Sequence, residues 1–158
     1  MPRTLGEISP KRRWILPLLL CSRQAATADG QHPLDRIRMQ KAVFLLTRRG
    51  ALGWRELYAY KPYDWGPYCR DLVDDLDALA AQGLVRVSQS MGTKYGPYVL
   101  TEQGQALADA SWRALRSEEQ SFLTTVRGYV TSKDFNGLLR EVYAEYPEYA
   151  SESIWSGK

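Results

Sequence analysis

Cysteine and histidine are scarce in this 158-residue chain, which limits the chemistry it can perform. The only histidine, His32, has no neighbouring cysteine or carboxylate pair at the spacing of a metal site. The two cysteines, Cys21 and Cys69, lie far apart, and we expect two reduced thiols rather than a disulfide. The sequence also lacks a P-loop, Cys-x-x-Cys, Gly-x-Gly-x-x-Gly and Gly-x-Ser-x-Gly. These absences favour a protein that is not an enzyme and holds no metal or cofactor.

Long hydrophobic runs are absent as well. The longest, residues 14–21, has eight residues and contains Pro17, whereas a membrane-spanning helix needs about 20. It is also short for a signal peptide, and no small-residue cleavage site follows it. With 44% apolar and 25% charged residues, the composition is that of an ordinary globular protein and excludes disorder, a coiled coil or a disulfide-rich miniprotein. We therefore expect a cytoplasmic protein with no membrane partner.

The net charge of +3 is unevenly distributed. Residues 1–55 hold eleven lysines and arginines against three acidic residues, whereas residues 56–80 hold two against six. A basic N-terminal third is typical of proteins with a polyanionic partner. Ordinary solubilising charge is the alternative explanation.

Hydrophobic residues recur three and four positions apart over most of the chain, which predicts helices. Residues 60–68 hold two prolines and a glycine and are predicted to be non-helical. Gly66-Pro67 is expected to force a sharp entry into the third helix, with Pro67 in its first turn. The predicted helices cover residues 14–28, 33–49, 67 or 68 to 82, 101–115, 118–131 and 134–146, and the predicted strands cover 84–88 and 95–100.

Three helices, a hairpin and a further helix follow one another in the order of a winged helix-turn-helix domain. The strings Gln82-Gly83-Leu84-Val85 and Tyr98-Val99-Leu100-Thr101-Glu102-Gln103-Gly104 resemble the "LxxxGLV … YxLTxxG" pattern of many prokaryotic winged-helix proteins. The resemblance implies an α+β, mostly α fold with a winged helix-turn-helix core. We assign residues 1–29 to a basic arm and packing helix, 30–115 to the core, and 116–158 to a C-terminal helical extension with an acidic, aromatic tail. One shared core is expected to hold Phe44, Leu45, Leu72, Leu76, Leu79, Leu84 and Val99.

A narrower resemblance covers most of the chain beyond residue 35. The string RMQKAVFLL at residues 38–46, followed by YDWGPYC at 63–69, resembles the "RLQKLxFLL … PYxYGPYS" pair of uncharacterised YwgA-like winged-helix proteins. Cys69 stands where that pattern usually has serine. The pair is also distantly similar to one in Panacea-type antitoxins, and residues 138–149 resemble the "LLxxVYxxYPEY" ending of some YwgA-like proteins.

Duplex DNA is the first partner that this fold suggests, in a transcriptional regulator. Tyr68, Cys69 and Arg70 are predicted to form the first turn of the groove-entering helix, where free N–H groups and a guanidinium suit a phosphate or a base edge. Lys94 and Tyr95 stand at the predicted wing. Further phosphate contacts are expected from basic residues of the arm and the second helix, namely Lys11, Arg12, Arg13, Arg36, Arg38, Arg48 and Arg49.

A protein partner is the alternative, with the chain acting as an antitoxin or as an accessory subunit of a phage-defence or other multi-protein system. Asp71, Asp74 and Asp75 are predicted to lie opposite the buried leucines of the third helix, where they would repel phosphates. Such an acidic helix suits a basic partner, or a homodimer formed with the basic N-terminal third. Tyr149 and Trp155 in the tail are expected either to fold back over the core or to dock on a partner.

Overall fold

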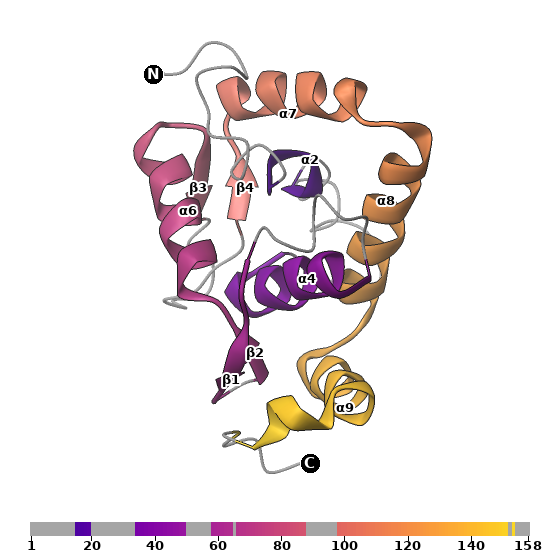
Figure 1. Ribbon diagram of the computed structural model, residues 1–158. Coiled ribbons are helices and arrows are strands. Elements are labelled where there is room, and N and C mark those ends of the chain that lie inside the picture. The colour runs from indigo at the N-terminus through magenta and orange to yellow at the C-terminus, as the bar shows by residue number, and fades with distance from the viewer. Residues whose placement is uncertain are drawn as a thin grey trace.

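The computed structural model describes residues 15–19, 34–49, 58–64, 66–87, 98–151 and 153 of the chain. Within these residues the fold is mostly helical, with two small antiparallel sheets, and the predicted α+β, mostly α class is confirmed (Figure 1). The elements are α2 (Ile15–Leu19), α4 (Arg36–Arg49), β1 (Lys61–Tyr63), β2 (Gly66–Tyr68), α6 (Arg70–Ala81), β3 (Val85–Val87), β4 (Tyr98–Leu100), α7 (Glu102–Ala114), α8 (Ser117–Ser132), α9 (Phe135–Glu145) and the 3-10 helix η2 (Pro147–Ala150).

Helices α4, α6, α7, α8 and α9 occupy five of the predicted helical segments. Helix α4 begins later than predicted because Asp35 caps it: the Asp35 Oδ1 atom accepts the Arg38 N–H at 2.8 Å. The first predicted helix is described only over α2. No helix in the described part of the chain is long and apolar enough to cross a membrane.

Strands β1 and β2 pair as a β-hairpin, and the prediction that Pro67 opens the third helix is wrong. Pro67 lies in β2 opposite Pro62 of β1. Neither proline has a backbone N–H, so this central pair exchanges no hydrogen bond, and prolines are tolerated in so short a ribbon. Gly66, the first residue of β2, takes a φ of 94°, a backbone conformation that favours glycine. Tyr68 is consequently a strand residue and Cys69 the N-cap of α6, so neither belongs to the first helical turn.

The second sheet joins α6 to α7 through Thr101. Strand β3 pairs with β4, with Val85 opposite Leu100. The Thr101 hydroxyl donates to the Gly83 carbonyl at 2.7 Å and accepts the Gly104 N–H at 3.0 Å, which caps α7. A Cβ atom on Gly104 would lie 1.9 Å from the Leu84 carbonyl oxygen. The winged-helix-like string therefore has a structural role, because it packs the start of α7 directly against the end of α6.

One hydrophobic cluster joins the N-terminal and C-terminal halves. Helix α2 packs on α7 and α8, and α4 packs on α8. Of the predicted core residues, Val99 is buried outside this cluster. The others are confirmed as its members: Phe44, Leu45, Leu72, Leu76, Leu79 and Leu84.

The C-terminal segment folds back on the molecule. Helix α9 contacts β2, and η2 contacts both strands of the hairpin, at the lower end of the view in Figure 1. Tyr149 is buried in the main cluster, with its ring centroid 4.9 Å from that of Phe44. Of the two alternatives for the tail, Tyr149 therefore follows the first, folding back over the core, and its own chain covers it. Trp155 lies outside the described residues.

Candidate functional site

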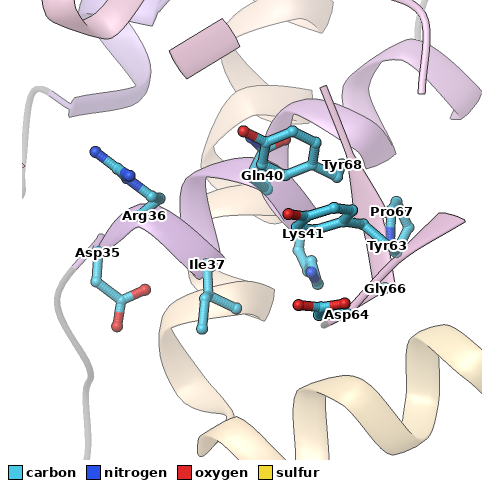
Figure 2. Close-up of a pocket in the computed structure, with 10 residues that line it drawn as sticks. All are labelled: Asp35, Arg36, Ile37, Gln40, Lys41, Tyr63, Asp64, Gly66, Pro67 and Tyr68. Carbon is cyan, nitrogen blue, oxygen red and sulfur yellow. The ribbon is translucent and has the colours of Figure 1, made fainter. Parts of the chain in front are cut away.

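The two halves of the RMQK…GPYC motif meet at one cavity, between the first turns of α4 and the β1–β2 hairpin (Figure 2). Its volume is about 370 Å³, within the usual range of small-molecule sites. Its lining combines charged, aromatic and apolar side chains: Asp35, Arg36, Ile37, Gln40, Lys41, Tyr63, Asp64, Gly66, Pro67 and Tyr68.

Gln40 fixes the geometry of the hairpin end. Its amide Nε2 donates to the Cys69 carbonyl at 3.0 Å, and its Oε1 accepts the Cys69 N–H at 3.0 Å. The side chain thus pairs with a peptide unit as a neighbouring strand would. Both bonds are buried, so α4 and the start of α6 are held in one relative position.

Lys41 is buried beneath the hairpin. Only 2% of the residue is exposed. A Cβ atom on Gly66 would lie 3.3 Å from Lys41 Cε and Nζ and 3.4 Å from Tyr143 Cε1, so a side chain there would press closely on Lys41, and the φ of 94° would strain any residue other than glycine. Burial lowers the pKa of Lys41 to about 7, and the Asp35 carboxylate opposes that shift. A large share of the amine is therefore neutral near pH 7.

Asp35 is itself held by Arg38. The Arg38 Nη1 atom donates to Asp35 Oδ2 at 2.7 Å, and Nη2 donates to the Lys133 carbonyl at 3.0 Å. Arg38 is buried, so the prediction that it contacts phosphates is wrong. Its role in the structure is to tie the start of α4 to the end of α8.

Two tyrosines form one wall of the cavity. The rings of Tyr63 and Tyr68 lie with centroids 4.6 Å apart and planes 30° from parallel. Tyr63 is 45% exposed, which is unusual for so large an apolar surface. Arg36, also in the lining, donates from Nε to the Tyr98 hydroxyl at 3.4 Å. Figure 2 shows the Arg36 guanidinium extending away from the rest of the lining.

The arginines at the end of α4 hold the C-terminal segment. Arg48 donates to the Tyr149 hydroxyl at 3.0 Å, lies 3.6 Å from the Glu148 carboxylate, and covers the Phe44 ring at 5.5 Å. Arg49 donates to the Tyr146 hydroxyl at 3.1 Å and forms an ion pair with Glu145. These two predicted phosphate contacts are thus already engaged within the chain.

Helix α6 presents an acidic face to solvent. Arg70 is its one basic residue, with a side chain 73% exposed, and its Nε donates to Asp74 at 3.2 Å. Asp71, Asp74 and Asp77 are exposed on this helix. The predicted exposure of Asp75 is wrong: the residue is 9% exposed and accepts a 2.6 Å hydrogen bond from Tyr58.

The error at Asp75 follows from helix geometry. At 100° per residue, Asp75 lies within about 60° of both Leu72 and Leu79, on the buried side of α6. Its carboxylate is accommodated there because Tyr58 supplies a donor.

Several predicted contacts fall outside the described residues. They are Lys11, Arg12 and Arg13 of the predicted arm, and Lys94 and Tyr95 of the predicted wing. Sequence reasoning missed Gln40 and Lys41 as site residues. The only signal that could have found them was their place in the resemblance motif, since neither helix periodicity nor charge counting distinguishes a buried lysine from an exposed one.

Neither a scan of family models nor a search of curated proteins finds a match for this chain. The likeness to YwgA-like proteins therefore stays a resemblance between short motifs. Among the described residues, no group of three or more histidines, cysteines or carboxylates is placed to hold a metal ion.

Proposed function

We propose that this chain is a non-enzymatic protein-binding module and that its partner docks on the exposed face of α6. One observation carries the proposal: the solvent face of α6 holds Asp71, Asp74 and Asp77, and its single cation, Arg70, is paired with Asp74. A helix entering a DNA groove would need the opposite charge, because it lies between two rows of phosphates.

The contacts of the other arginines support the same proposal. Arg38 is buried on Asp35, while Arg48 and Arg49 bind the C-terminal segment. These three basic residues of the segment 1–55 are therefore paired with carboxylates of the same chain, which leaves fewer cations for the continuous positive surface expected of a DNA-binding domain.

The chemistry of α6 favours a partner with a basic surface. Complementary charge contributes more to the rate of association and to the choice of partner than to affinity. An antitoxin or an accessory subunit of a multi-protein system fits this behaviour. A second copy of this chain, docking through its basic N-terminal residues, would also fit, and a light-scattering mass at several concentrations identifies that case.

Affinity capture from the native host tests the proposal. The wild type is compared with the double variant Asp74→Asn/Asp77→Asn and with the matched control Glu102→Gln/Glu118→Gln, which removes two exposed carboxylates from α7 and α8. We expect one stoichiometric protein partner that the control retains and the α6 variant loses. Recovery of nucleic acid alone, or equal capture by all three proteins, contradicts the proposal.

Duplex DNA binding is the second candidate, and the tip of α6 favours it. The Cys69 side chain makes no capping hydrogen bond at the start of the helix, and the exposed Arg70 follows it directly. Helix N-termini bind phosphates through their first N–H groups. A winged helix-turn-helix core would approach DNA with this tip. If the chain binds DNA in this way, Arg70→Ala should weaken DNA binding.

A further inference from the structure

We propose that a second cavity, between the C-terminal half of α4, the segment before β1 and η2, is a binding site for a small neutral polyol such as a monosaccharide. Its volume is about 440 Å³, within the usual range of small-molecule sites. Its described lining includes no residue of α6, so the inference stands whether or not α6 has a protein partner. The lining residues are Phe44, Thr47, Arg48, Tyr58, Tyr60 and Tyr149.

The hydroxyl of Tyr60 carries the inference. Its oxygen is buried, and no atom of the described residues forms a hydrogen bond with it. Buried hydroxyls without a partner are uncommon in folded proteins, because the lost hydration is not replaced. Burial raises the pKa of Tyr60 well above its usual value, and Cys69, Tyr58 and Tyr149 add to that rise. Tyr60 therefore keeps its proton at neutral pH and brings to the cavity a group that both donates and accepts.

The other polar groups of the lining comprise both donors and acceptors. The Tyr149 hydroxyl accepts the Arg48 Nη2–H at 3.0 Å, so its own proton remains for another acceptor. The Thr47 hydroxyl donates to a backbone carbonyl of its own helix at 2.8 Å, and the Tyr58 hydroxyl donates to Asp75 at 2.6 Å. Toward a ligand these two oxygens can act only as acceptors. Adjacent hydroxyl groups of a polyol match such a mixed lining, because each of them donates and accepts.

The charges around the cavity favour a neutral ligand. Arg48 is the one charged residue in the described lining, and the Glu148 carboxylate lies 3.6 Å from its guanidinium. The carboxylate of Asp75 lies behind Tyr58, which donates to it. An anionic ligand would thus meet two carboxylates against one cation. A cationic ligand would meet Arg48, whose guanidinium already covers two of the aromatic rings in the lining.

The cavity is complete only when the C-terminal segment is docked, because Tyr149 belongs to η2. The Tyr149 ring packs on Phe44 of α4, with centroids 4.9 Å apart, and its hydroxyl is held by Arg48. A ligand that contacts both Tyr60 and Tyr149 therefore binds the docked form better than an undocked one. Binding should then stabilise the docked position of η2.

The test uses D-glucose, D-galactose and D-ribose as probes, in ¹⁵N NMR titrations of the full chain. We expect at least one of these sugars to shift the amide signals of residues 44–49, 58–60 and 147–150 saturably. Two further compounds serve as comparisons: 1,2-dimethoxyethane, which accepts hydrogen bonds but cannot donate them, and inorganic phosphate, which is an anion. Both should bind more weakly than the best sugar. Saturating sugar should also slow amide hydrogen exchange in η2.

A matched pair of variants assigns the binding to Tyr60. Tyr60→Phe keeps the ring and removes only the hydroxyl, and it should weaken sugar binding ~5-fold or more. Tyr63→Phe, which changes a residue outside this cavity, should bind sugar as wild type does. The proposal is overturned if none of the three sugars causes saturable shifts at the cavity, if Tyr60→Phe binds as tightly as wild type, or if phosphate binds more tightly than every sugar. The titrations of wild type decide the matter even where a variant does not fold.

Discussion

The side-chain amide of Gln40 forms two hydrogen bonds of 3.0 Å with the backbone of Cys69, 29 residues further along the chain. This pair of bonds joins α4 to the point where the hairpin becomes α6. Gln40→Ala leaves a buried N–H and a buried carbonyl without partners, and we expect a loss of ~2–4 kcal/mol in the free energy of unfolding. Urea denaturation measures it, with Gln105→Ala on α7 as the control, expected within ~0.5 kcal/mol of wild type. Equal effects of the two substitutions would contradict the assigned role.

Gly104 and Gly128 offer a matched comparison of two helical glycines. A Cβ atom on Gly104 meets the Leu84 carbonyl, whereas one on Gly128 meets nothing within 4 Å. We expect Gly104→Ala to destabilise the protein by more than ~2 kcal/mol through backbone displacement. Gly128→Ala should stabilise it by ~0.5–1 kcal/mol, because alanine loses less conformational entropy in a helix. Thermal unfolding of both variants measures the difference, and a tolerated Gly104→Ala would show that α7 does not pack on the α6 end as described.

Tyr58 supports the buried carboxylate of Asp75. Tyr58→Phe removes the 2.6 Å hydrogen bond and should cost ~1–3 kcal/mol of stability, since the carboxylate loses a buried donor. Tyr63→Phe, which changes an exposed ring, should stay within ~0.5 kcal/mol of wild type. Chemical denaturation separates the two. If both variants match wild type, Asp75 does not depend on Tyr58.

Arg48 should hold the C-terminal segment in place. In Arg48→Ala the hydrogen bond to Tyr149 and the cation–π contacts with the aromatic cluster are lost. We expect faster amide hydrogen exchange in α9 and η2, with α7 unchanged. Arg140→Ala, an exposed arginine on α9, is the control. Unchanged exchange in α9 and η2 of the Arg48 variant would exclude the anchoring role.

Lys41 should make stability depend on pH. Its pKa is about 7 in the folded protein and near 10.5 in the unfolded chain, so the unfolded state binds more protons between these values. The free energy of unfolding should therefore rise with pH, at up to ~1.4 kcal/mol per pH unit. Urea titrations at pH 7.5, 8.5 and 9.5 measure the slope for wild type, and Lys41→Met should remove it. If wild type and Lys41→Met show the same pH dependence of stability, that dependence comes from groups other than Lys41.

Much of the fold could be predicted from the sequence, because its helices have clear periodicity and end signals. The spacing of Leu72, Leu76 and Leu79 predicted the buried face of α6, and Gly83 predicted where the helix ends. The hairpin at residues 61–68 could not be assigned, since two facing prolines hide the alternation of a strand. Its dependence on Gln40 is a long-range contact, which local patterns do not contain.

The site was harder to predict than the fold because charge alone does not reveal burial. Arg38 and Lys41 are charged residues on an amphipathic helix, and such residues are usually exposed. Here they are buried beside Asp35 and the hairpin. Asp75 was wrongly predicted to be exposed for a related reason. Its position borders the apolar stripe, and its burial is made favourable by Tyr58, which is remote in sequence.

The central claim, that α6 is a protein-binding surface and not a DNA-reading one, is tested most directly by fluorescence anisotropy with mixed-sequence duplex DNA over a salt series. The proteins are wild type, Arg70→Ala and Asp74→Asn/Asp77→Asn. The account predicts no binding by wild type or Arg70→Ala even at low salt, and weak, salt-sensitive binding by the Asp→Asn variant as repulsion is relieved. Wild-type binding that falls steeply with salt and weakens about tenfold or more in Arg70→Ala would contradict it and establish the DNA-binding alternative.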